Sequence, residues 1–390
     1  MTKETIFTIL IAVSVFGFLI LIHELGHFIS ARIFKVKINE FSIGMGPRLM
    51  YYDSKKSGTR YSVAIFPFGG FVAMEGENGE EGSDLKEKNN LTDATLAIET
   101  ENAAESGAKA LTASPNPARF DQKPAWQRLI ITAAGALVNI VAGFLIMVII
   151  STFSPMNSTT VERFTDKDGN TYTDETGEAV TMTGSGIMVG DKIIAINGKR
   201  VNIINEMSYE IMRNGDNPIT IKLVRNGELI TIENVRFSAA ESDDGGDDSV
   251  YFEMEEIKKT PFSIISYSFR YSVLIVRLVW ESLIGLITGK YSLAAVSGPV
   301  GISAEIGAAA KMGIIPLLYM VVMISINLGV MNLLPVPALD GGRIITILIE
   351  IITRKKIPAK VEGIINGVGL MVLLGLSAVV LVKDIIQLII

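Results

Sequence analysis

The chain contains two histidines, and they flank a glutamate in the string His23-Glu24-Leu25-Gly26-His27. Residues four apart lie on one face of a helix, so both imidazoles can reach one metal ion while Glu24 stands beside it. This spacing is an HExxH zinc motif, in which the glutamate serves as general base. The motif follows an apolar run from Thr5 to Ile22. A metal site at the end of such a run lies at membrane depth, where polar groups are costly and usually functional.

A catalytic zinc site needs three protein ligands and an open position for water. The chain has no cysteine and no third histidine, so the third ligand must be an aspartate or a glutamate. The best candidate is Asp340, in the string NLLPVPALDGG that follows an apolar run. Pro335 and Pro337 end that run and remove two backbone donors. The third apolar run should end at the cytoplasmic side of the membrane, as the run before the histidines does, so we expect Asp340 at the same depth as the histidines.

The composition predicts a polytopic α-helical membrane protein, because 49% of the 390 residues are hydrophobic. Four apolar runs have roughly the 17 to 25 residues that a helix needs to cross a bilayer. We predict transmembrane helices at about residues 5–28, 126–153, 314–334 and 362–384. A secretory signal peptide is the rival interpretation of the first run. However, no small-residue cleavage site follows it.

Lysines and arginines gather in the loops after the first and third runs, whereas nothing basic follows the second run until Arg163. The positive-inside rule then places those two loops in the cytoplasm and residues 154–261 outside. Both termini would also lie outside the bacterial cytoplasmic membrane. The net charge of −6 argues against nucleic acid as a partner.

The segment Arg60–Met74 is rich in β-branched and aromatic residues, with Gly69-Gly70 as a possible turn. We predict a β-hairpin at about residues 60–74. It is apolar enough to be membrane-associated beside the metal if protein buries its edges. A surface hairpin on the cytoplasmic face is the alternative. The acidic insert that follows, 75–117, cannot bury a core, and we assign it no chemistry.

Short strands with glycine turns between them indicate a soluble α+β domain at residues 157–238. The string Gly190-Asp191-Lys192-Ile193 leads into Asn197-Gly198, and Asn226-Gly227 is a second turn. This pattern resembles a bacterial PDZ domain, a fold that captures extended peptides at a sheet edge. Gly184-Ser185-Gly186 stands where such domains usually have Ala-Gly-Leu. We interpret residues 239–297 as a linker and an amphipathic juxtamembrane helix, because Arg270, Arg277 and Glu281 share one side of it.

Taken in order, the motifs resemble those of the bacterial site-2 protease family, in its single-PDZ, Gram-positive-like branch. They are HELGH, FSIGMGP, KPAWQR, AG-x-x-x-N, the GD-x-I-x-x-ING core, SGPVGI and NLLPVPALDGG. The resemblance implies a membrane protease core built from residues 1–153 and 298–390. It also implies that His23, His27 and Asp340 bind Zn²⁺, that Glu24 is the general base, and that Asn139 and Asn332 hold the substrate. Ala136 departs from the family's usual proline, and Arg343 from the histidine of some relatives.

The function implied by this resemblance is intramembrane proteolysis. Such a zinc metalloendopeptidase cleaves the transmembrane segments of single-span membrane proteins after a first cut outside the membrane. Anti-sigma factors and signal-peptide remnants are the implied substrates, and we expect a monomer. The alternative is a membrane scaffold with a structural zinc and a peptide-binding PDZ domain. A structural zinc site normally has four protein ligands, whereas only three candidates are found here. A zinc transporter is a further alternative, but it would need several ligands along a path through the membrane, and the chain has only two histidines.

Overall fold

The computed structural model describes residues 3–77, 118–165, 186–215, 217–237, 251–292 and 296–389. These residues fall into two units, one of residues 1–142 with 283–390 and the other of residues 143–282. The helices α2 (Ala125–Phe153) and α4 (Pro261–Ile287) each run across the boundary between the units. The predicted acidic insert 75–117 lies outside the described residues, except for its first three.

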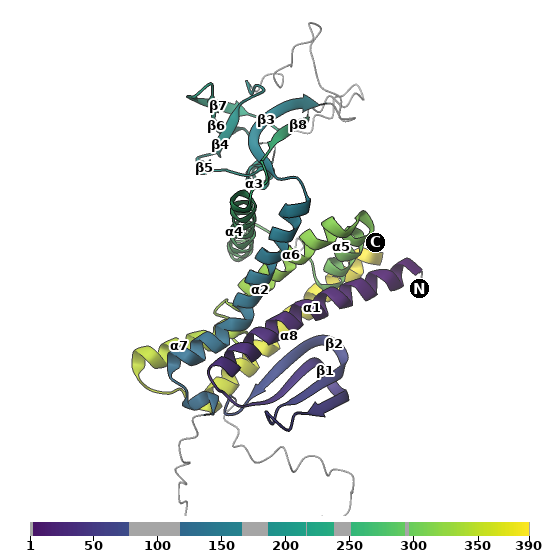
Figure 1. Ribbon diagram of the computed structural model, residues 1–390, viewed down its shortest axis with the longest axis vertical. Helices are drawn as coiled ribbons and strands as arrows, with labels where there is room; N and C mark the ends of the chain where they lie inside the picture. The colour runs from purple at the N-terminus through teal and green to yellow at the C-terminus, as the bar shows by residue number, and fades with distance from the viewer. Residues whose placement is uncertain are drawn as a thin grey trace, which may run out of the picture. The chain divides into compact units, whose positions relative to one another are not determined.

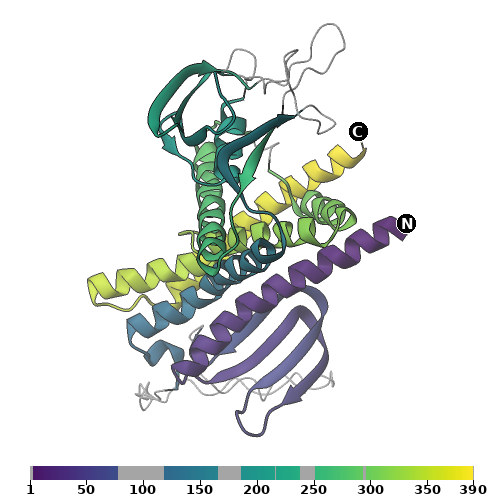
Figure 2. The same cartoon turned by 45° about the horizontal axis from the view of Figure 1, so that its top comes forward.

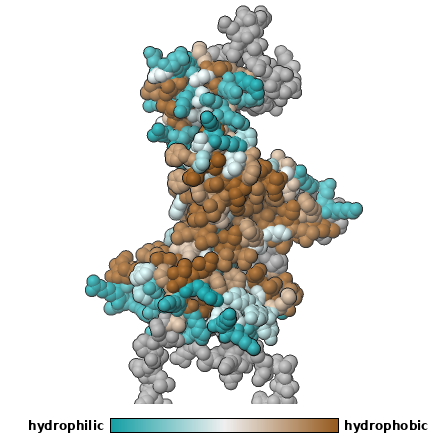
Figure 3. Space-filling model, viewed as in Figure 1, coloured by the Kyte–Doolittle hydropathy of each residue, from teal (hydrophilic) through white to brown (hydrophobic). Residues whose placement is uncertain are grey.

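Four helices of the described chain are long and apolar enough to cross a membrane. They are α1 (Lys3–Ile33), α2, α6 (Ile314–Asn332) and, from Lys360 to Asp384, α8 (Ala359–Ile389). Large apolar side chains such as Leu10, Val141 and Met371 are exposed on them, and apolar residues gather over these helices in Figure 3. Burial in lipid removes such side chains from water. The helices are consistent with a polytopic membrane protein, although α6 ends at Asn332 rather than at residue 334.

Two shorter helices, α5 (Pro299–Met312) and α7 (Asp340–Thr353), were not expected from the sequence. The first begins in the SGPVGI motif, with Pro299 at the position where its missing N–H is not needed. The backbone N–H of Gly301 donates to the buried Asp384 carboxylate of α8 at 3.0 Å, and that of Gly298 does so at 3.3 Å. The motif therefore joins α5 to α8.

The first unit also contains a sheet of two long, bent strands, β1 (Ile38–Asp53) and β2 (Arg60–Met74). Figures 1 and 2 both show this sheet along α1. The predicted hairpin within residues 60–74 is wrong in its pairing, because this whole segment is one strand. It pairs antiparallel with β1, as in Phe41 opposite Val72 and Tyr51 opposite Ser62. Gly69, with φ +103°, lies at the bend of β2, and the two ends of this strand flank the same stretch of β1, because Phe41 is paired with both Tyr61 and Val72.

A hydrophobic core joins the end of α1 to this sheet and to the start of α2. Its buried members are Ala31, Val36, Ile38, Phe41, Val72, Met74, Phe120 and Ile131. Phe120 belongs to a short 3-10 turn, η3 (Phe120–Gln122), that precedes α2. Burial of these side chains stabilises α1, α2 and β2 in fixed positions relative to one another. Those three elements carry most of the candidate site.

The second unit contains a sheet of six strands in the order β7-β6-β4-β3-β8, with β5 paired to β4. Its elements are β3 (Asn157–Thr165), β4 (Lys192–Ile196), β5 (Lys199–Arg200), α3 (Ile204–Asn214), β6 (Ile219–Arg225), β7 (Glu228–Val235) and β8 (Tyr251–Glu256). Val161, Ile193, Met207 and Leu223 lie in its buried core. The sheet extends beyond the predicted end of the domain at residue 238. The charged string Tyr251–Glu256 lacks the apolar alternation of a buried strand, and it forms an edge strand beside β3.

Helix α4 is not among the four candidate spans, and its charged residues form ion pairs within the second unit. Arg277 pairs with Glu281 one turn further along, at 2.9 Å, and with the buried Glu210 of α3. The Tyr209 hydroxyl donates to Glu281 at 2.6 Å. These contacts hold α4 against α3. That α4 also lies in the membrane interface stays a prediction.

Candidate metal centre

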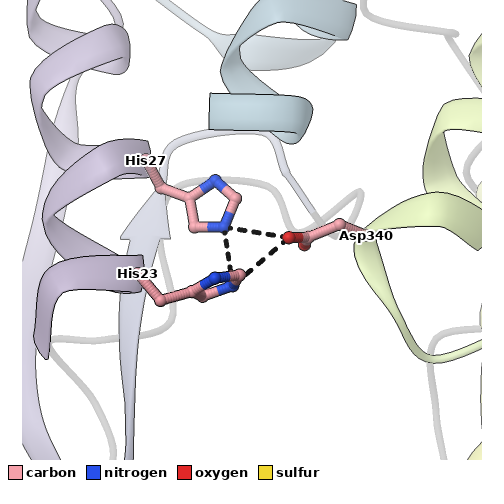
Figure 4. A group of neighbouring side chains, drawn as sticks. All are labelled: His23, His27 and Asp340. Carbon is pink, nitrogen blue, oxygen red and sulfur yellow. Dashed lines mark hydrogen bonds and ion pairs between the residues drawn. The ribbon is translucent and has the colours of Figure 1, made fainter. Parts of the chain in front are cut away.

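The last turns of α1 bring His23 and His27 to one face of the helix, as their spacing requires. Both histidines are buried, and Figure 4 shows the two rings meeting the carboxylate of Asp340. Their Nε2 atoms lie 3.3 Å apart. Two ring nitrogens from one helix therefore converge on a single point.

Asp340 is the first residue of α7 and follows a tight turn that begins at Leu333. Ala338 has φ +71° in this turn. A Cβ atom on Gly341 would lie 1.9 Å from the carbonyl oxygen of Leu334, so only glycine fits beside the turn. The close approach of Gly341 to Leu334 thus places the Asp340 carboxylate toward α1.

The spacing of the three ligand atoms fits zinc. Asp340 Oδ2 lies 3.2 Å from His23 Nε2 and 3.3 Å from His27 Nε2. Tetrahedral zinc with bonds of about 2.0–2.1 Å separates its ligand atoms by about 3.3–3.4 Å. Asp340 Oδ2 is buried and accepts no well-aligned hydrogen bond, as expected for an oxygen that faces a cation. Among the described residues, these three form the group of His, Asp or Glu side chains that could hold a metal.

Helix α2 supports the histidines from behind. The Nδ1 atom of His27 lies 2.9 Å from the backbone carbonyl oxygen of Ile131. A proton on this Nδ1 leaves Nε2 free to bind a metal. Gly135, in the AG-x-x-x-N motif, lies so close that a Cβ atom there would be 2.3 Å from His27 Nε2. These two contributions of α2 were not expected, because neither a backbone carbonyl nor a close approach has a sequence signal of its own.

The two predicted asparagines differ in their surroundings. Asn139 of α2 is fully buried, and its Nδ2 atom lies 3.4 Å from Nδ1 of His23. The Ser325 hydroxyl of α6 donates to the backbone carbonyl oxygen of Asn139 at 2.8 Å. Asn332 is the last residue of α6 and is partly buried. In the described part of the chain, its side chain makes no hydrogen bond to the three candidate ligands. Asn139 therefore belongs to the immediate surroundings of the metal group.

Glu24 faces a cavity of about 180 Å³ that also exposes the three candidate ligands. A Cβ atom on Gly70 of β2 would lie 3.0 Å from Cγ of Glu24, so the strand packs directly on this side chain. The remaining lining residues are Phe71, Val72, Met74, Glu77, Thr132 and Arg343. Arg343, one turn after Asp340, pairs with Glu77. The cavity can therefore admit a water molecule or a peptide group beside both the metal group and Glu24.

Comparison with known proteins gives matches over almost the whole chain. Residues 11–376 match the model of Peptidase family M50. A protein of Clostridium acetobutylicum whose name assigns it to the zinc metalloproteases is 32% identical over 381 residues, covering 97% of this chain and 98% of its own. The regulator of sigma-W protease RasP of Bacillus subtilis is 28% identical over 429 residues, with the same coverage. The chain therefore belongs to peptidase family M50, the site-2 protease family of zinc metalloproteases.

Proposed function

We propose that this chain cleaves the transmembrane segments of single-span membrane proteins. In this proposal His23, His27 and Asp340 bind the zinc ion and Glu24 is the general base. The observation that carries it is the triangle of ligand atoms, with sides of 3.2, 3.3 and 3.3 Å, beside a cavity that Glu24 also lines. A structural zinc site is normally closed by four protein ligands. The described residues offer three here, which favours catalysis over a scaffold role.

The side chains around the cavity have separate tasks in hydrolysis. Zinc, when bound, supplies Lewis acidity and brings the pKa of water toward neutrality. Glu24 takes the proton that the attacking water loses and later delivers it to the leaving amine nitrogen. Gly70 packs on Cγ of Glu24 and keeps this side chain beside the ligands. Burial of His23 and His27 strengthens each electrostatic interaction at the site.

A helical substrate must unwind before its peptide bond can be cut, because a helix hides its carbonyls in hydrogen bonds four residues apart. Strand β2 offers replacement hydrogen bonds. Its residues Gly70–Met74 pair with β1 on one side, and Phe71, Val72 and Met74 line the cavity. A substrate strand added to the other side would lie beside Glu24. Asn139 and Asn332 would then hold the substrate backbone, as the family resemblance implies.

The placement of charge supports an orientation in the membrane. With the basic loops in the cytoplasm, the sheet of the second unit would be extracytoplasmic, as would both termini of this multi-pass chain in the cell membrane. We interpret that sheet with α3 as a PDZ-like domain, which would exclude bulky outer domains or bind their trimmed ends. The name of the Bacillus subtilis relative suggests anti-sigma factors as substrates after a first cut. Signal-peptide remnants are a second substrate class, and the active form would be a monomer.

Replacement of Glu24 by Gln tests the proposal. The variant should lose cleavage of a tagged single-span substrate in reconstituted vesicles, because the amide cannot accept the proton from water, and it should keep its zinc. Glu233→Gln, on an exposed position of β7, is the matched control and should cleave like the parent chain. Undiminished cleavage by the Glu24→Gln variant would refute the proposal.

A further inference from the structure

The side chain of Asn139 lies behind one of the candidate zinc ligands rather than in front of it. His23 Nε2 is the atom that faces His27 Nε2, at 3.3 Å, and Asp340 Oδ2, at 3.2 Å. If Nε2 binds the metal, the neutral imidazole carries its proton on Nδ1. That N–H points away from the metal and needs an acceptor. The group at this position is the Asn139 amide, 3.4 Å away.

The two ends of an asparagine amide have the same shape and exchange places by a half-turn of the group. With nitrogen toward His23, two N–H donors would face each other. The Asn139 Oδ1 atom would then be buried without a hydrogen-bond partner. With oxygen toward His23, the Nδ1–H donates to Oδ1, so no two donors face each other and this buried oxygen has a partner. Asn139 is 0% exposed, so bulk water cannot act as the acceptor instead.

We propose that Asn139 is a positioning residue of the metal site: its Oδ1 accepts the Nδ1 proton of His23 and so fixes the tautomer that binds zinc through Nε2. This inference rests on the proposed zinc ligands and deepens the role of Asn139 beyond holding a substrate. Helix α2 then supplies the outer acceptor for both histidines, since the carbonyl oxygen of Ile131 accepts the corresponding proton of His27. One helix orients both rings.

The surroundings of Asn139 hold it in place for this role. The Ser325 hydroxyl of α6 donates to the backbone carbonyl oxygen of Asn139 at 2.8 Å. One turn away, a Cβ atom on Gly329 would lie 2.6 Å from the carbonyl oxygen of Ala136, so α6 packs directly against this turn of α2. The backbone of Asn139 is thus fixed, and a hydrogen bond from its side chain to His23 requires little further loss of conformational entropy.

Zinc affinity of the full-length chain, measured in detergent by competition with a chromophoric chelator, tests this inference. Loss of an outer hydrogen bond to a ligating histidine typically weakens metal binding about 10–100-fold, and we expect this loss for Asn139→Leu. Asn139→Asp keeps an acceptor oxygen and should bind zinc within a few-fold of the parent chain. Asn332→Leu is the matched control, because among the described residues that side chain makes no hydrogen bond to the ligands.

Each outcome separates the two proposals. Unchanged zinc affinity in Asn139→Leu, or equal weakening in Asn139→Leu and Asn139→Asp, would overturn the positioning role, because the hydrogen bond would then not matter. Thermal unfolding at saturating zinc shows whether the Asn139→Leu variant is folded. If it is not, the zinc affinity of Asn139→Asp decides whether an acceptor oxygen is needed at this position. A parent chain that binds no zinc at all would instead overturn the proposed function.

Discussion

At the scale of single residues, α1 and α2 meet where side chains are absent. A Cβ atom on Gly26 would lie 2.6 Å from the carbonyl oxygen of Ala134. The next residue of α2, Gly135, leaves just enough space for the ring of His27, since a Cβ atom there would be 2.3 Å from Nε2. This close approach allows the carbonyl oxygen of Ile131 to reach Nδ1 of the same ring. The glycines of both helices therefore serve the geometry of the metal group.

Replacing Gly135 with Ala should therefore displace the His27 ring and lower zinc affinity on the order of tenfold or more, as disturbed ligand support does elsewhere. The same chelator competition measures it. Gly375→Ala is the control, since no atom lies within 4 Å of a Cβ there, and it should bind zinc like the parent chain. Equal affinity in both variants would show that the close approach is not needed.

The sequence allowed the choice of Asp340 because ligand counting works without a structure. The chain offers two histidines and no cysteine, so a carboxylate had to complete the set. The structure places that carboxylate against both rings; whether the three bind zinc stays a prediction. Support by Ile131 and Gly135 could not be predicted, because it depends on how closely two helices approach.

At the scale of elements, the aspartate of the Gly190-Asp191 motif connects two strands of the second unit. Asp191 precedes β4 and is 0% exposed. Its carboxylate accepts two hydrogen bonds from Arg225 of β6, both at 2.7 Å, and one from the backbone N–H of Met188 at 2.8 Å. The aspartate thus joins the loop before β4 to the end of β6.

Asp191→Ala removes the buried acceptor of the Arg225 guanidinium, and hydrogen bonds to a charged group contribute about 1.5–3 kcal/mol. Hydrogen exchange of the full chain should show β4 and β6 opening more easily by that amount. Glu253→Ala breaks the exposed pair with Arg163, and such surface pairs contribute only about 0–1 kcal/mol. Similar exchange in the two variants would argue against a structural role for Asp191.

Elements set by local composition were easier to predict than those set by distant partners. Long apolar runs predicted α1, α2, α6 and α8, since length and hydropathy alone identify such helices. The pairing of β2 with β1 depends on residues that lie apart in the chain, and it was predicted wrongly as a hairpin. Edge strand β8 was missed because half of its string Tyr251–Glu256 is glutamate.

At the scale of the whole molecule, one site is assembled from both ends of the chain. The first unit combines residues 1–142 with 283–390, so α1 provides His23, Glu24 and His27 while α7 provides Asp340. The second unit lies between these halves in sequence and has its own core. The order of the motifs along the chain predicted this split arrangement. The same order does not predict contacts such as the one between Asp384 and the start of α5.

X-ray absorption at the zinc edge, on purified full-length chain, tests the central claim most directly. The account predicts one zinc ion per chain, bound by two imidazole nitrogens and by oxygen at about 2.0–2.2 Å. Asp340→Ala should lose the ion or change its coordination, whereas Asp53→Ala, at an exposed position of β1, should not. Zinc bound with an unchanged spectrum in the Asp340→Ala variant would contradict the account.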